Sequence, residues 1–192
     1  KFLDIKCRMA GLRPSAVVMV ATVRALKMHG GLAKTDLGRE DLGALEAGLP
    51  NLLRHVSNIV NVYKLPCVVA VNRFPTDTDA EISLVIEKCR ALGVRTVLST
   101  VWADGGAGGT ELAEEVVRLC ELPNDFSFSY PLEDSIEDKI TAVVRRIYGG
   151  DGVTFAPAAS KEIARLTAAG CSEKCSRRLL SGGPRDFCAP LV

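Results

Sequence analysis

Residues 16–21 read Ala-Val-Val-Met-Val-Ala, and this uninterrupted apolar run decides the fold class. A second run, Cys-Val-Val-Ala-Val, occupies residues 67–71, and a third apolar segment covers residues 94–99. Short apolar runs rich in β-branched residues are typical of strands buried on both faces, as in parallel sheets. The sequence therefore predicts three such strands.

Amphipathic segments alternate with these strands. Residues 40–62 carry apolar side chains at spacings of three and four, which predicts a helix that Pro50 kinks or splits. Thr78 or Asp79 is expected to cap a helix that Gly93 ends. The other predicted helices cover residues 110–121, 136–147 and 158–168. Because strands and helices alternate, we predict an α/β fold, a parallel sheet with crossover helices.

Length and composition limit the function classes. The 192 residues suffice for one domain and a tail, at roughly 150 residues per domain. Hydrophobic residues make up 47%, which is typical of a globular chain and excludes a disordered one. The net charge of +1 gives no excess of cations, so neither nucleic acid nor a membrane surface is an expected partner. The odd number of 7 cysteines without a secretion signal predicts a reducing, cytoplasmic location.

The pattern changes along the chain. Residues 1–122 hold the predicted α/β domain, and residues 123–170 are expected to form a helical or mixed region. Residues 171–192 are rich in Cys, Ser, Gly and Arg and have no apolar period, so disorder is expected there. The spacing of Cys171 and Cys175 resembles a metal motif, but a second ligand pair is lacking and no metal site is predicted.

Ligands of open parallel sheets bind beyond the carboxyl ends of the strands. The segments expected at that edge are residues 22–31, which begin as a turn or short helix, and the loops 72–78 and 99–109. In the first segment, Arg24, Lys27 and His29 precede the pair Gly30-Gly31. Cations beside glycines suit a phosphate or carboxylate, although a solvated basic turn has the same composition.

The other two segments carry aromatic side chains. A strand that ends in Asn72 and is followed by Asp77 resembles the base-reading turn of nucleotide-binding P-loop folds, where a carboxylate accepts N–H groups of the base. Phe74 and Trp102 either sandwich a flat heterocycle or cover the strand ends. The usual phosphate-binding motif, G-x-x-x-x-G-K-[ST], does not occur in the 192 residues.

Residues 20–31, Val-Ala-Thr-Val-Arg-Ala-Leu-Lys-Met-His-Gly-Gly, resemble a signature of the formate–tetrahydrofolate ligase family. Further matches follow in the family's order: Lys6-Cys7-Arg8, Asn72-x-Phe74-Pro75-Thr76-Asp77-Thr78, Trp102-Ala103-x-Gly105-Gly106, Asp138-Lys139-Ile140 and Ile147-Tyr148-Gly149. The resemblance runs to about Gly170. It implies an incomplete P-loop NTPase-like fold, a Rossmann-like three-layer α/β sheet. It also implies a ligase that joins formate to tetrahydrofolate with ATP, giving 10-formyltetrahydrofolate, ADP and phosphate through formyl phosphate.

The resemblance implies two groups of site residues. Phe74 and Trp102 match the aromatic residues that hold the pterin, and Pro75, Thr76 and Asp77 match the lining of that pocket. The residues expected near the nucleotide are Arg24, Lys27, His29, Gly30, Gly31 and Asn72. The implied ligands are ATP, Mg²⁺, tetrahydrofolate and a monovalent cation, and the implied assembly is a homo-oligomer. No catalytic residue is assigned on this chain.

Two departures from the family shape the hypotheses. The phosphate-binding loop and the arginine for formyl phosphate are expected ahead of the stretch present here. After Gly170 the sequence resembles a shifted reading frame, so residues 171–192 are expected to be non-family sequence. The first hypothesis is a ligase fragment that is inactive by itself, and the second a non-catalytic folate-binding or assembly remnant. The third, a nucleotide-binding switch on the Asn72–Asp77 loop, is disfavoured by the missing phosphate motif.

Overall fold

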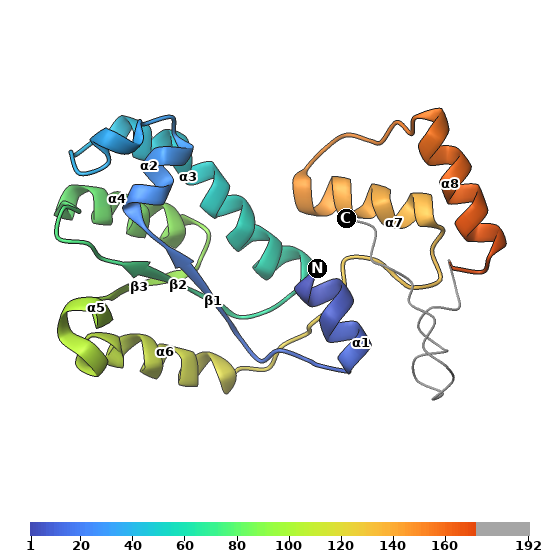
Figure 1. The fold of residues 1–192 in the computed structure, drawn as a ribbon. Helices are drawn as coiled ribbons and strands as arrows, with labels where there is room; N and C mark the ends of the chain where they lie inside the picture. Colours follow the sequence, from blue (N-terminus) through green and yellow to red (C-terminus); the bar gives the residue numbers. More distant parts are fainter. Residues whose placement is uncertain (172–192) are drawn as a thin grey trace. The chain divides into compact units, whose positions relative to one another are not determined.

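The structure is a computed structural model that describes residues 1–171. These residues form two compact units, one of Pro14–Phe126 and the other of Lys1–Arg13 with the segment that begins at Ser127 (Figure 1). The predicted boundary after residue 122 lies near the observed one, but residues 1–13 belong to the second unit rather than to the α/β domain. The prediction for residues 171–192 lies outside the described residues, apart from Cys171.

A buried carboxylate explains why the first residues join the later segment. Asp4 accepts a hydrogen bond from the Ser129 backbone N–H (2.7 Å) and another from the Ser129 hydroxyl (2.8 Å). Both side chains are buried, so these bonds form away from water, where an unpaired carboxylate is costly. No sequence period reports such a contact between residues so far apart.

The first unit contains the predicted parallel sheet. Its strands are β1 (Val17–Ala21), β2 (Cys67–Asn72) and β3 (Arg95–Ser99), in the order β1-β2-β3. Val17 pairs with Cys67 and Val68 pairs with Arg95, both in parallel register. The α/β fold with parallel strands is therefore confirmed, as an incomplete Rossmann-like arrangement.

Helices cover both faces of the sheet. Figure 1 shows α3 (Leu42–Ser57) and α4 (Asp79–Ala91) on one side and α6 (Thr110–Cys120) on the other. On the α6 side, Leu119 packs against Val68 and Val97, and all three are buried. These contacts make β2, the central strand, the core of the unit.

β1 differs from its prediction as a strand buried on both faces. Val18 is 38% and Val20 60% exposed. Side chains alternate across a strand, and Val18 lies in register with Val68, whose face α6 covers. The packing of α6 is mainly on β2 and β3, whereas β1 forms the edge of the sheet.

Most helix predictions hold, with two local differences. α3 runs through Pro50 without a break and continues into a π-helical turn, residues 58–62. The predicted loop 101–109 is instead a short helix, α5 (Val101–Asp104), followed by a 3₁₀ turn. The predicted helices of the second unit are present as α7 (Ile136–Ala142), extended by a π-helical turn to Tyr148, and α8 (Pro157–Ala168). Among the described residues, no helix is both long and apolar enough to span a membrane.

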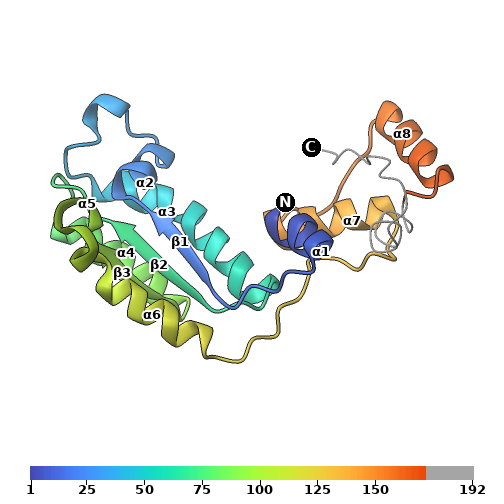
Figure 2. The ribbon, with the colours of Figure 1, turned by 60° about the horizontal axis from the view of Figure 1, so that its bottom comes forward.

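Two glycines let α2 (Val23–His29) lie directly against α3, as Figures 1 and 2 show. A Cβ atom added to Gly48 would stand 1.9 Å from the backbone oxygen of Leu26, and one added to Gly30 would stand 1.8 Å from that of Ala44. Backbone atoms cannot yield as the end of a side chain can. The close approach of the two helices therefore requires glycine at both positions.

We expect Gly48→Ala to lower the free energy of unfolding of the full chain by about 3 kcal/mol, because the new methyl group forces α2 away from α3. Gly43→Ala is the matched control in the same helix, since its Cβ would meet only a side-chain oxygen at 3.5 Å. That variant should be neutral or gain up to about 1 kcal/mol. Urea unfolding measures both, and equal stabilities of the two variants would contradict the packing argument.

Candidate functional site

The three segments predicted to hold the site meet at the carboxyl edge of the sheet. The first is α2 with the residues after it, the second the loop Arg73–Thr78, and the third the start of α5. The Arg73 backbone N–H donates to the Ser99 oxygen (3.1 Å), which joins the second segment to the end of β3. The prediction of a shared edge is confirmed by the parallel register of the three strands.

The loop after β2 is closed by its own carboxylate. The Asp77 backbone N–H donates to the Phe74 oxygen (3.0 Å), and the Phe74 N–H donates to Oδ2 of Asp77 (2.8 Å). This pair of bonds fixes the Phe74 backbone relative to the carboxylate, as in the turns that aspartate favours. Phe74 itself is half-buried, so its ring is neither enclosed in the core nor fully in water.

Asp77 is buried yet only half satisfied. Its second oxygen, Oδ1, has no hydrogen-bond partner among the described residues. Burial raises the pKa of Asp77, and this effect exceeds the opposing one of the Phe74 N–H bond. A buried acceptor without a partner is costly, so Oδ1 is poised to accept a hydrogen bond from a bound molecule.

Arg24 lies on the aromatic residue of this loop. Its guanidinium carbon stands 5.6 Å from the centre of the Phe74 ring, within the range of a cation–π contact. Arg24 was predicted beside a phosphate, whereas the structure brings it to Phe74, a residue predicted for the pterin. The two predicted groups of residues are therefore not separate at this point.

Lys27 is buried, so it is not one of the solvated cations of a basic turn. Its side chain is fully buried, and Nζ lies 2.7 Å from Oε1 of Glu81, which is also fully buried. Nζ donates a second hydrogen bond to the Arg39 oxygen (2.8 Å). With its charge neutralised in this way, Lys27 is engaged inside the protein and does not present its ammonium group to a phosphate.

Glu81 lies beside this edge of the sheet, and the sequence analysis did not identify it. Besides Lys27, it accepts the backbone N–H of Asp41 at Oε1 (3.1 Å) and that of Thr78 at Oε2 (3.1 Å). Burial alone raises the pKa of Glu81, but the bonds from Lys27, Thr78 and Asp41 outweigh it, so the pKa lies below its ordinary value of 4.5. The spacing Thr78-x-x-Glu81 is a helix-capping pattern that was readable in the sequence, and the structure forms that capping box.

The remaining predicted residues serve different purposes. Gly30 packs against α3. At residue 31 the φ of +95° favours glycine, although a Cβ added there would meet no atom within 4 Å. Asn72, Pro75 and Thr76 are exposed at the carboxyl edge of the sheet, and His29 is exposed at the end of α2. Trp102 stands in the first turn of α5 and is 76% exposed. No prediction about their ligand contacts is tested by this arrangement.

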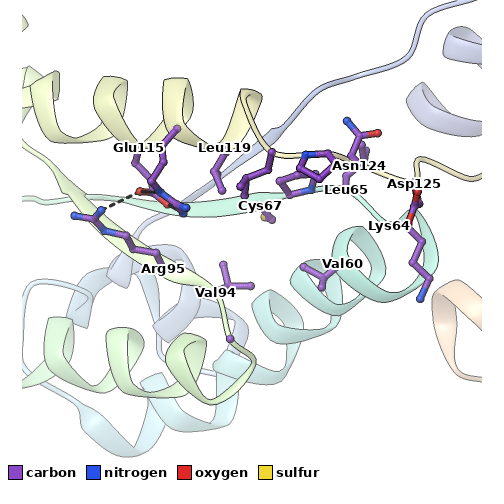
Figure 3. Close-up of a pocket in the computed structure, with 15 residues that line it drawn as sticks. Val60, Lys64, Leu65, Cys67, Val94, Arg95, Glu115, Leu119, Asn124 and Asp125 are labelled. Carbon is purple, nitrogen blue, oxygen red and sulfur yellow. Dashed lines mark hydrogen bonds and ion pairs between the residues drawn. The ribbon is translucent and has the colours of Figure 1, made fainter.

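A hollow of this unit lies at the other end of the sheet. It holds about 470 Å³ and is lined by residues at the starts of β2 and β3, including Cys67 and Arg95 (Figure 3). In it, buried Glu115 accepts hydrogen bonds from Arg95 (2.9 Å) and from Arg118 (2.7 and 2.9 Å). One carboxylate meets two guanidiniums here, and none of the residues predicted to bind a ligand lines this hollow. The described residues also contain no group of three or more His, Cys, Asp or Glu side chains suited to a metal.

Comparison with known families adds to this geometry. A family model described as formate–tetrahydrofolate ligase matches residues 1–175. The match covers most of the 192 residues and confirms the resemblance. It ends at residue 175, a short distance past Gly170, so Cys171 and Cys175 lie within the matched range, and the non-family tail stays a prediction.

Glu81→Gln should lower the free energy of unfolding by about 3–5 kcal/mol at pH 7, because it leaves the ammonium of Lys27 buried without its counter-charge. The pKa of Glu81 is lowered in the folded chain, so the stability it supplies is complete above its ordinary value of 4.5 and lost as the pH falls through the folded pKa. The difference between wild type and variant, measured by urea unfolding, should therefore shrink in acid.

Glu87→Gln on the same helix is the control, because Glu87 is exposed. It should change the free energy of unfolding by less than about 0.5 kcal/mol. If Glu81→Gln lowered the free energy of unfolding no more than this control does, the buried pair would not stabilise this edge of the sheet.

Proposed function

The chain belongs to the formate–tetrahydrofolate ligase family, and from this premise we propose that its sheet edge carries the tetrahydrofolate-binding part of that ligase. The reaction proposed for the complete site joins formate to tetrahydrofolate at the expense of ATP. Formyl phosphate forms first, and the folate amine N10 then attacks the formyl carbon and releases phosphate. Such a site works chiefly by positioning its reactants and neutralising charge.

One observation carries the proposal: Asp77, whose Oδ2 is bonded to the Phe74 backbone N–H, has a buried Oδ1 without a partner among the described residues. A pterin is flat and presents N–H donors along one edge. Its ring suits the face of an aromatic side chain, and its N–H groups suit an unsatisfied carboxylate oxygen. The combination supports a flat heterocycle with donors over a simple phosphate or carboxylate.

Trp102 supplies the second ring in this proposal. It follows β3, and Phe74 follows β2, its hydrogen-bonded neighbour, so both rings come from adjacent strand ends. An indole that is 76% exposed loses water-exposed apolar area when a ring covers it, which favours binding. Pro75 and Thr76, exposed on the same loop, are proposed to line the pocket.

Nucleotide binding is a weaker part of the proposal. His29 and Asn72 are exposed and remain candidates to approach ATP, whereas Lys27 is withdrawn from that role by its bond to Glu81. Mg²⁺ accompanies ATP in the proposed reaction, but the described residues hold no carboxylate cluster suited to it, so no step is assigned through the metal. A monovalent cation, homo-oligomeric assembly and a cytoplasmic location stay predictions.

Phe74→Ala and Trp102→Ala should each weaken tetrahydrofolate binding by about 1–3 kcal/mol, or roughly 5- to 150-fold in Kd, because each removes one face of the ring contact. Asp77→Asn should weaken it comparably, since the amide no longer offers a charged acceptor. Isothermal titration calorimetry of the full chain measures all three.

Tyr148→Ala is the matched control for Trp102→Ala, because Tyr148 is 74% exposed but lies in the other compact unit. Its Kd should equal that of the wild type. Unchanged affinity in both Phe74→Ala and Trp102→Ala would exclude the proposed aromatic contacts.

We also expect the 192-residue chain alone to form no 10-formyltetrahydrofolate from formate, ATP and tetrahydrofolate, because its sequence contains no G-x-x-x-x-G-K-[ST] motif to hold the transferred phosphoryl group. An assay for ADP and for the formylated folate tests this. Turnover would reject the hypothesis of an inactive fragment, whereas folate binding without turnover would favour the fragment or binding-remnant hypotheses over the nucleotide switch.

A further inference from the structure

Arg24 stands beside the proposed folate site with its hydrogen-bonding capacity unused. It is exposed in the first turn of α2, and among the described residues it makes no hydrogen bond or ion pair. Lys27, one turn further along the same helix, is by contrast fully engaged with Glu81 and the Arg39 oxygen. The two cations of the segment therefore differ in what they can offer a ligand.

The guanidinium carbon of Arg24 lies 5.6 Å from the centre of the Phe74 ring, and this contact uses none of its N–H donors. A guanidinium resting on an aromatic ring uses its flat face, whereas its N–H groups point outward in its own plane. These groups remain available to an acceptor on a molecule that binds at the same ring.

Asp77 places an acceptor next to this donor. Its Oδ2 is held by the Phe74 N–H at 2.8 Å, which leaves Oδ1 without a partner. The positive charge of Arg24 is also near enough to act on the carboxylate, lowering its pKa against the larger effect of burial. Phe74 thus carries a free cationic donor and is bonded to a carboxylate with a free acceptor oxygen.

Resting on the proposed function, we propose that Arg24 is a specificity-determining residue that reads the 2-amino-4-oxo edge of the pterin, donating to the ring oxygen while Asp77 accepts the neighbouring N–H groups. An analogue with an amino group in place of that oxygen would place its own N–H donors against the N–H donors of Arg24. A site built to bond a particular group discriminates strongly against a ligand that leaves its polar atoms unpaired.

The test compares tetrahydrofolate with its 4-amino counterpart by calorimetry on the full chain. Wild type should bind the 4-oxo compound about tenfold or more tightly, as expected for a hydrogen bond to a charged group. Arg24→Met should bring this ratio close to one, chiefly by weakening the 4-oxo compound. Arg24→Lys should retain part of the preference, because it keeps the charge but loses the flat contact with Phe74.

Arg54→Met is the control for removing an exposed arginine, since Arg54 lies on α3 outside this edge and should keep the wild-type ratio. A wild-type ratio in Arg24→Met, with the melting temperature unchanged, would overturn the inference and leave the proposed function standing. Failure of wild type to bind tetrahydrofolate would instead overturn the proposed function.

Guanine carries the same pattern of donors and acceptor, with its oxo group at position 6, so GMP forms a third arm of the experiment. Direct binding of GMP that Arg24→Met abolishes, with no binding of tetrahydrofolate, would overturn the assignment to a pterin and give this site to a nucleotide. No competition by GMP, together with an Arg24-dependent preference among the folates, is the expected result.

Discussion

The buried ion pair of Lys27 and Glu81 is the interaction on which the ligand-facing edge depends. Both side chains are fully buried, so water cannot solvate either charge if the pair separates. Glu81 also accepts the N–H groups of Thr78 and Asp41, so one carboxylate ties together α2, the entry to α3 and the loop after β2. Loss of either partner would leave an uncompensated buried charge, so the pair favours the observed packing of these three segments.

That constraint divides the signature of residues 20–31 into two kinds of residue. Gly30 and Lys27 face the interior. Gly30 allows the close approach of the α3 backbone, and Lys27 forms an ion pair with Glu81. Arg24 looks outward, onto the ring of Phe74. A motif of cations and glycines resembles an anion-binding loop. Here Lys27 and Gly30 serve the packing of the interior, and Arg24 is exposed.

Two carboxylates four residues apart show how environment separates such roles. Glu81 is buried with every contact satisfied, and hydrogen bonds bring its pKa below the ordinary value. Asp77 is buried with one oxygen unsatisfied, and burial leaves its pKa raised. The first pattern is typical of a structural ion pair, and the second is typical of a group in a binding site. In the proposed folate site, Asp77 is therefore a recognition residue and Glu81 a support.

The sequence by itself determined the parallel α/β order, the family and the edge at which the site residues gather, because these follow from local apolar periods and from short motifs. Only the tertiary structure decided that Lys27 is buried against Glu81, that Arg24 rests on Phe74, that β1 has one open face, and that Asp4 draws residues 1–13 to Ser129. Each of these depends on a partner distant in the chain. Periodicity reports which face of an element is apolar, but the pairing of buried charges depends on which elements pack together, and that is set only in three dimensions.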